Sequence, residues 1–261
     1  MKRASSPPPA APRLLVVDVG NSSTALGVYA GGRIVRRERI PTRQLKVRAA
    51  TALMRDVIGS RGVDGAALAS VAPSVVPVVA KAVHAAAGVD PLRIHYQLVL
   101  GAPINYPRPE VLGADRLANL AGAVDRYPLP AIVVDIGTAT TFDVIRPRKG
   151  YCGGAIAPGP ALMLEYLAER TELLPSIDLI PVRRGIGRQT EEAMRLGALH
   201  GYRGMVKEIV AQLMRSLRTR SVTLCATGGY AAWVLRGMEL PFVYDPDLTL
   251  RGIGKIYEWN A

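Results

Sequence analysis

The chain has 261 residues, of which 49% are hydrophobic, and it carries a formal net charge of +12 at pH 7. This length and apolar content can fill one large α/β core, or two smaller cores with a cleft between them, which excludes disorder for the body of the chain. The 33 Lys and Arg are scattered and only two Phe and two Trp are present, a composition that disfavours nucleic-acid binding through base stacking. We expect the charge to steer anionic small substrates instead.

The first residues, Met1 to Arg13, differ in composition from the rest. Three consecutive prolines with Ser and Ala offer little to bury, so we expect a disordered tail over residues 1–13. This segment lacks the apolar stretch of a secretory signal, and no later segment has the ~18 uninterrupted apolar residues of a membrane span. The sequence therefore predicts a cytoplasmic protein with no membrane contact.

Two segments of the chain repeat one another at a constant offset of 117 residues, LLVVDVGNSST from Leu14 and AIVVDIGTATT from Ala131. Each copy is an apolar run that fits a buried strand, then an Asp-x-Gly turn, then hydroxyl residues that lead into a second apolar run. The repeat predicts strand, tight turn and strand in each half. The matched residues are Asp18 with Asp135, Gly20 with Gly137, and Thr24 with Thr141.

The two turns have the chemistry of a phosphate site. Gly20 and Gly137 can adopt positive φ and let backbone N–H groups approach an anion, and neighbouring Ser and Thr residues add hydroxyl donors. The Asp at the end of each strand supplies a fixed carboxylate for a cation or a metal-bound water. Two ordinary β-hairpins with Asp-Gly turns are the plainer alternative, and the duplicated hydroxyl pattern argues against it.

Strand and helix patterns alternate in the rest of the chain, which indicates the α/β class. The further predicted elements are, in order, a helix over Arg48–Gly59, a strand over Ala66–Ala69, a helix over Ser74–Ala87, a loop-strand-loop over Gly150–Pro160, a helix from Ala161 to about Glu169, a helix from Thr190 to about Leu217 and a strand over Val222–Ala226. A double glycine, Gly228-Gly229, follows the last strand and precedes a helix that begins near Tyr230. A strand, glycine turn and helix N-terminus in this order can accommodate a nucleotide base or ribose.

Two Asp-Gly turns about a hundred residues apart, with a late Thr-Gly-Gly, resemble the superfamily of acetate kinase, sugar kinases, Hsp70 and actin. The stretch YPRPEVLGADRLAN, from Tyr106 to Asn119, resembles the acceptor-site segment of type III pantothenate kinases. The resemblance continues in order through five further segments and covers nearly everything from residue 14 onward. These segments are DIGTATT (135–141), GGAIAPG (153–159), GRQT (187–190), TGG (227–229) and LTLRG (248–252).

This resemblance implies duplicated actin/hexokinase-like (ribonuclease H-like) domains, with mixed sheets flanked by helices and an active site in the cleft between them. The two domains would span residues 14–127 and 128–261. The implied reaction is ATP-dependent phosphorylation of pantothenate to 4′-phosphopantothenate, the first step of coenzyme A biosynthesis. Members of the family are homodimers with sites near the subunit interface.

The resemblance also implies site residues. Asp115 would be the general base, Asp135 the ligand of a monovalent cation (K⁺ or NH₄⁺), and Mg²⁺ would accompany ATP with Asp18 nearby. The positions matching nucleotide contacts are Asp18, Val19, Gly20, Asn21, Ser22, Ser23, Thr24, Ala25 and Thr138, and Gly228 and Gly229 form the third glycine turn. The positions matching pantothenate contacts are Tyr106, Gly113, Ala114, Asp115, Arg116 and Thr190.

The residues themselves agree with this chemistry but allow plainer explanations. Kinases commonly use Asp to accept the alcohol proton, and the planar fork of Arg116 suits the carboxylate of an acid such as pantothenate. Asp115-Arg116 could equally be an ordinary helix N-terminus, and Thr190 before Glu191-Glu192 an ordinary N-cap. Gln189, where the family more often has Asn, and Leu196, where a small polar residue is usual, lie close to Thr190.

Two other functions remain open at the level of sequence. A sugar kinase of the same superfamily would need several polar side chains around the sugar hydroxyls, whereas Asp115-Arg116 has an apolar surround. A non-catalytic ATP-binding regulator of a transcription factor would be expected to lose the base or a phosphate turn, yet Asp18, Asp115 and Asp135 are all present.

Overall fold

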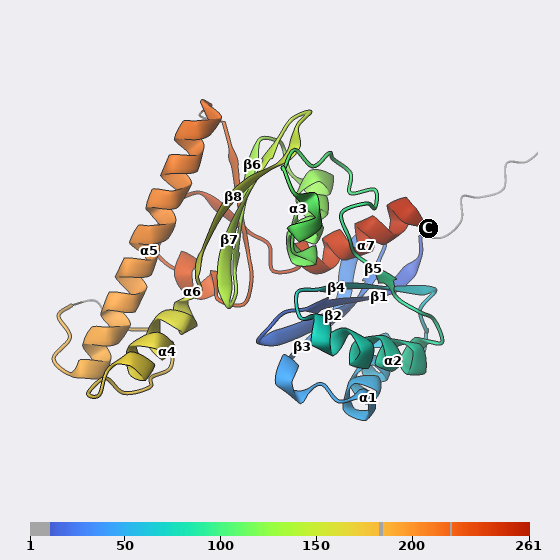
Figure 1. Ribbon diagram of the computed structural model, residues 1–261, viewed down its shortest axis with the longest axis horizontal. Helices are drawn as coiled ribbons and strands as arrows, with labels where there is room; N and C mark the ends of the chain where they lie inside the picture. Colours follow the sequence, from blue (N-terminus) through green and yellow to red (C-terminus); the bar gives the residue numbers. More distant parts are fainter. Residues whose placement is uncertain (1–10, 183–184, 220) are drawn as a thin grey trace, which may run out of the picture.

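The computed structural model describes residues 11–182, 185–219 and 221–261 (Figure 1). The tail predicted over residues 1–13 lies outside the described residues as far as residue 10. Arg13 was wrongly assigned to this tail, because it begins strand β1 (Arg13–Val19). Its guanidinium donates to the carbonyls of Gly62 and Ile58, and its backbone N–H donates to Asp64.

Two five-stranded sheets form the framework, and each has the same topology. The first has the order β3-β2-β1-β4-β5 and the second β8-β7-β6-β9-β10, so the strands correspond in sequence order. In both sheets the three strands of the initial meander pair antiparallel, whereas the last two strands pair parallel. The remaining strands are β2 (Ser23–Ala30), β3 (Arg33–Pro41), β4 (Gly65–Ser70), β5 (Leu92–Arg93), β6 (Ala131–Ile136), β7 (Ala139–Arg146), β8 (Gly150–Pro158), β9 (Thr223–Thr227) and β10 (Phe242–Tyr244). The duplication predicted from the two Asp-x-Gly segments is therefore confirmed.

Helices cover both faces of each sheet, which is why the central strands β1 and β6 are almost wholly buried. One face of the first sheet packs on α1 (Val47–Ile58) and α2 (Val76–Ala87), and one face of the second packs on α5 (Thr190–Leu217). In Figure 1, α3 (Ala114–Arg126) and α7 (Leu248–Asn260) lie between the two sheets. The shorter elements are α4 (Pro160–Arg170), α6 (Ala231–Leu235) and the 3₁₀ turns Thr42–Gln44, Pro73–Val75 and Pro109–Val111.

The long helix α5 has the predicted bounds, but Thr190 is not its N-cap, as the plainer explanation of this residue supposed. Gln189 is the N-cap and no side chain caps the helix, while Thr190 is already helical. The acids Glu191 and Glu192 occupy the first turn, where the macrodipole favours negative charge.

The last helix, α7, follows the second sheet in sequence but packs against the first. It contacts β1, β2, β4 and α3, and its apolar residues share one core with strands of both sheets. Glycines allow this close packing, because a Cβ on Gly252 would collide with the Ala118 carbonyl and one on Gly254 with the Tyr29 ring. The chain thus crosses between the sheets twice, once after α3 and once before α7.

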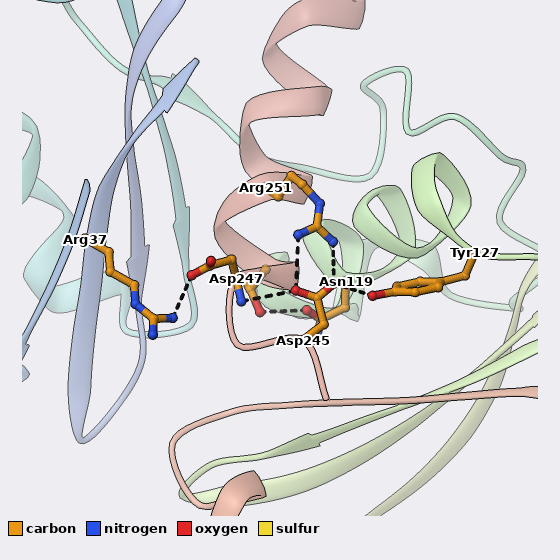
Figure 2. Close-up of polar contacts among 7 residues, drawn as sticks. Arg37, Asn119, Tyr127, Asp245, Asp247 and Arg251 are labelled. Atoms are coloured by element: carbon orange, nitrogen blue, oxygen red, sulfur yellow. Dashed lines mark hydrogen bonds and ion pairs between the residues drawn. The ribbon is translucent and has the colours of Figure 1, made fainter. Parts of the chain in front are cut away.

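A buried polar cluster joins these two crossings (Figure 2). Asp245, on the connection from β10 to α7, pairs with both terminal nitrogens of Arg251 at 3.1 and 2.5 Å, and accepts a hydrogen bond of 2.6 Å from the Tyr127 hydroxyl at the end of α3. The Asp245 and Arg251 side chains are only 9% and 4% exposed. Burial alone would raise the pKa of Asp245, but the hydrogen bonds from Arg251 and Tyr127 hold it below its ordinary value.

We expect Asp245→Asn to lower the free energy of unfolding by about 3 kcal/mol, because it leaves the Arg251 guanidinium buried without a charged partner. The matched control is Asp56→Asn, which breaks an ion pair whose Arg36 and Asp56 side chains are 46% and 66% exposed. That change should cost less than about 1 kcal/mol. Urea unfolding followed by circular dichroism gives both values, and equal losses in the two variants would contradict the role assigned to Asp245.

Candidate functional site

A cavity of about 560 Å³ lies where the turns of the two halves meet. Its walls come from the β1–β2 turn, the β6–β7 turn, the β9–α6 turn, the first turn of α3, the edge strand β3 and the connection from β10 to α7. Both halves of the chain therefore contribute to one site, at the carboxyl ends of the central strands β1 and β6.

The two Asp-x-Gly turns are closed by similar but not identical hydrogen bonds, and neither Gly20 nor Gly137 adopts the positive φ considered from the sequence. The Gly20 N–H donates to the Ser23 carbonyl and the Gly137 N–H donates to the Ala139 carbonyl, each at 3.0 Å. The turns also touch one another, because the Thr138 hydroxyl donates to the Ser22 hydroxyl at 2.8 Å. The cavity thus has a continuous rim of backbone and hydroxyl groups from both copies.

Eight of the eleven predicted nucleotide residues line the cavity, and three do not. Those that line the cavity are Asp18, Gly20, Asn21, Ser23, Ala25, Thr138, Gly228 and Gly229. Val19 and Thr24 are fully buried and do not line the cavity, and Ser22 is exposed but is not among the residues that line it. The Thr24 hydroxyl instead hydrogen-bonds Thr42, whose hydroxyl donates to the Gly20 carbonyl and so supports the turn from inside the protein.

The third glycine turn packs tightly against the second copy. Gly228 has φ +96°, and a Cβ there would stand 2.5 Å from both an Asp135 carboxylate oxygen and the Ile136 carbonyl. At Gly229 a Cβ would meet only the Arg39 guanidinium, at 2.9 Å. Gly228 is therefore fixed by backbone conformation and by space, whereas Gly229 borders a movable side chain.

We expect Gly228→Ala to lower the free energy of unfolding by about 2–3 kcal/mol, because it combines an unfavourable positive φ with a collision against backbone. The melting temperature should fall by about 5–10 °C in thermal denaturation. Gly229→Ala is the adjacent control and should change it by less than about 2 °C, since the Arg39 side chain can turn aside. A Gly228→Ala protein as stable as wild type would show that this turn is not so constrained.

Three carboxylates converge on the cavity, those of Asp18, Asp115 and Asp135. Burial and the neighbouring charges of Asp115 and Asp135 raise the pKa of Asp18 to about 8. Burial likewise raises the pKa of Asp135 to about 6, opposed by a hydrogen bond from Asn119, and burial raises the pKa of Asp115. Such a concentration of acids is stabilised in its ionised form by cations.

Asp115 is the second residue of α3, two positions after the N-cap Gly113. Its Oδ1 accepts a hydrogen bond of 2.8 Å from the Arg116 backbone N–H. A Cβ on Gly113 would collide with this carboxylate, so glycine leaves the space that the acid occupies.

Asn119, one helical turn after Asp115, is fully buried and bridges two parts of the site. Its amide donates to Asp135 at 2.9 Å, and its carbonyl oxygen accepts from the Thr249 hydroxyl of α7 at 2.7 Å (Figure 2 shows Asn119). Sequence reasoning included Asn119 in the acceptor-site segment but gave it no role. Its spacing of four residues from Asp115, which places both on one face of a helix, is the signal that could have found it.

The residues predicted to hold the acceptor do not all lie together. Apart from Asp115, none of them is among the residues that line the cavity. The guanidinium of Arg116 forms an ion pair with the fully buried Asp143, at 2.6 and 2.7 Å, and lies over the Tyr151 ring, which Tyr106 contacts edge-on. Thr190, at the start of α5, belongs to the helical layer on the other face of the second sheet from α3.

The edge strand β3 contributes residues that sequence reasoning missed. Arg37, Glu38 and Arg39 line the cavity, although the sequence suggested only scattered surface charge. Their position depends on which strand forms the edge next to the phosphate turns, and that pairing is a property of the fold.

In residues 11–182, 185–219 and 221–261, no three His, Cys, Asp or Glu side chains are grouped as metal ligands. None of the helices in the described part of the chain is both long and apolar enough to span a membrane.

Solved structures share this fold at low sequence identity. A Campylobacter jejuni protein of the Baf family of transcriptional activators aligns over 94% of this chain and 97% of its own, with a TM-score of 0.56 and 18% identity. The ethanolamine utilization protein EutJ of Carboxydothermus hydrogenoformans aligns over 97% of this chain and 92% of its own, with a TM-score of 0.52 and 17% identity. These likenesses concern the fold alone.

Sequence comparison is more specific. A protein from Streptomyces avermitilis named type III pantothenate kinase is 38% identical over 260 residues, 95% of this chain and 98% of that relative. One of the same name from Akkermansia muciniphila is 53% identical over 154 residues, which are 59% of this chain and 63% of that relative. The profile of the type III pantothenate kinase family matches residues 14–212, a range that holds both Asp-x-Gly turns and Asp115. The chain therefore belongs to the type III pantothenate kinase family.

Proposed function

We propose that the protein transfers the γ-phosphoryl group of ATP to the primary hydroxyl of pantothenate, giving ADP and 4′-phosphopantothenate for coenzyme A biosynthesis. The observation that carries this proposal is the convergence of Asp115 with two phosphate-type turns in one cavity. Phosphoryl transfer needs chiefly positioning, charge neutralisation and an acceptor for the alcohol proton, and the cavity provides candidates for each.

In this mechanism Asp115 accepts the proton of the pantothenate hydroxyl. The hydroxyl oxygen forms a bond to the γ-phosphorus while the bond from that phosphorus to the β,γ-bridging oxygen breaks, and ADP leaves. Burial raises the pKa of Asp115, which makes its carboxylate a stronger base than an exposed Asp.

The nucleotide phosphates would lie along residues Asp18 to Ala25 and Thr138. The hydroxyls of Ser23 and Thr138 line the cavity and are suited to phosphate oxygens, and the Gly228-Gly229 turn, which also lines it, would border the base or ribose. Val19 and Thr24 are fully buried and would support the turn from inside the protein.

Cations fit the charge of the site. Four acids line the cavity (Asp18, Glu38, Asp115 and Asp135) against two arginines, so the polyanion ATP would meet net repulsion without metal ions. Mg²⁺ would accompany ATP beside Asp18, held largely through water and phosphate oxygens, and K⁺ or NH₄⁺ would bind at Asp135. When bound, these ions neutralise charge on the phosphates.

Pantothenate would lie beside Asp115, near Gly113, Ala114, Arg116 and Tyr106. The Asp143 ion pair leaves part of the Arg116 guanidinium to meet the carboxylate of pantothenate. The apolar rings near it, Tyr106 and Tyr151, suit the dimethyl-substituted part of this acid better than a sugar.

Thr190 would reach an acceptor site from a second copy of the chain, as part of a homodimer. The surface that supports this proposal is α4 with the segment that follows it, where large apolar side chains are exposed. These side chains are Leu162, Tyr166, Leu167, Leu173, Ile180 and Ile186. We place the reaction in the cytoplasm, where ATP is available.

The test is ADP release from purified protein with MgATP and K⁺, comparing pantothenate, glucose, N-acetylglucosamine and no acceptor. Release that requires pantothenate supports the proposal. Preference for a sugar would favour the sugar-kinase alternative, and silence with every acceptor, in NH₄⁺ as well as K⁺, would contradict a kinase function altogether.

A further inference from the structure

The edge strand β3 presents a row of arginines, two of which face the site. Arg37 and Arg39 are two residues apart, so they project from the same face of the strand, and both line the cavity. Arg36 projects from the opposite face, where it pairs with Asp56 of α1. Strand β3 thus holds two arginines that line the cavity, and Arg36, which does not line it, can serve as the control in mutagenesis.

The two cavity arginines differ in what holds them. Arg37 is committed to an ion pair of 2.6 Å with Asp247 at the start of α7, as Figure 2 shows. The Arg39 guanidinium donates to a neutral hydroxyl, that of Ser23, at 3.2 Å. Within the described residues Arg39 forms no ion pair, so its guanidinium can turn to an anionic ligand without breaking one.

Arg39 occupies the space between two of the glycine turns. Its terminal nitrogen is near Ser23 in the first turn, and lies 2.9 Å from where a Cβ of Gly229 would stand in the third. Its charge also lowers the pKa values of Asp18 and Asp135, the carboxylates at the ends of β1 and β6. Asp115 belongs to the same group of interacting charges, since it raises both of those pKa values.

We propose that Arg39 is a further catalytic residue, whose guanidinium binds the terminal phosphate of ATP and stabilises the charge that develops on it during transfer. This inference rests on the proposed function. A group that passes from the nucleotide to an acceptor beside Asp115 must lie among these charges, and a planar guanidinium can bind two phosphate oxygens at once. The purely structural alternative is that Arg39 only offsets the charges of Asp18 and Asp135.

The experiment compares Arg39→Ala, Arg39→Lys and Arg36→Ala in two assays. In turnover with saturating MgATP and pantothenate, Arg39→Ala should lower kcat about a hundredfold or more, Arg39→Lys should recover part of it, and Arg36→Ala should stay within about twofold of wild type. In calorimetric binding, Arg39→Ala should weaken MgATP about tenfold while leaving MgADP within about twofold, because ADP lacks the terminal phosphate.

The binding assay separates this inference from the proposed function. If wild-type protein turns over no acceptor, the proposed pantothenate kinase activity is refuted. The binding comparison still tests Arg39 in that case, because it asks only whether Arg39→Ala weakens MgATP more than MgADP. If Arg39→Ala raises the Kd values for MgATP and MgADP equally, or changes neither Kd nor kcat, the catalytic role of Arg39 is overturned. The structural alternative is then favoured.

Discussion

Asp115→Asn is expected to lower kcat for pantothenate phosphorylation by about a thousandfold, while the protein folds normally. The amide has nearly the shape of the carboxylate but cannot accept the hydroxyl proton, and a positioned base typically contributes 10²–10⁴-fold. The Asp115 Oδ1 position can still accept the Arg116 N–H, since the amide has one carbonyl oxygen. The measurement is steady-state ADP release with MgATP and pantothenate.

Two readouts make this prediction specific to a base. The melting temperature should not fall below that of wild type, because Asn removes a buried acid of raised pKa, and the Kd for MgATP should stay close to the wild-type value, because Asp115 acts on the acceptor. On the wild-type enzyme, activity should fall at acidic pH as Asp115 becomes protonated, and its raised pKa moves this fall to higher pH than for an exposed Asp. An Asn variant with more than a tenth of wild-type kcat would remove Asp115 from the role of base.

Asp18→Asn is expected to make the ligand-free protein more stable and the enzyme nearly inactive. The pKa of Asp18 is about 8 in the folded protein, against 3.8 as the ordinary value of the group. The folded state therefore holds a proton that the unfolded state has lost between about pH 4 and pH 8, and stability falls as pH rises through this window. Asn carries no ionisable proton, so it removes this penalty.

Thermal denaturation from pH 5 to pH 8 without ligands is the measurement. The wild-type melting temperature should decline with rising pH, whereas that of Asp18→Asn should decline less and exceed wild type by about 5 °C at pH 8. Turnover should fall about a hundredfold, because the carboxylate beside the nucleotide is lost. Asp90→Asn, which changes an exposed acid on the surface, is the control and should alter neither quantity. Parallel pH curves for wild type and Asp18→Asn would contradict the raised pKa.

Much of this architecture could be predicted from sequence because the informative patterns are local. The buried runs before Asp18 and Asp135 predicted the central strands, and the periodicity from Thr190 to Leu217 predicted α5 with both of its ends. The sequence predicts that the two turns and Asp115 belong to one site, and the fold brings them to one cavity.

The rest depends on contacts that no local pattern encodes. Arg39 lies in a run of charges typical of a solvated strand, and its place beside the turns follows from β3 forming the edge of the sheet. The pairing of Arg116 with Asp143 brings together residues 27 positions apart in different elements. Thr190 was predicted to lie with Asp115 because it matches the family pattern. That pattern does not show that Thr190 begins α5, in a different helical layer from Asp115.

The return of α7 to the first sheet has a consequence for synthesis on the ribosome. Strands β1, β2 and β4 emerge early, yet one face of their sheet, including Leu14, Val16 and Tyr29, is covered in part by residues 248–260 at the very end of the chain. The amino-terminal half therefore cannot complete its core until α7 has been synthesised, and its sheet keeps apolar surface exposed while the second half is made. The two halves therefore complete their folding together, and a variant truncated before Leu248 lacks the helix that joins them.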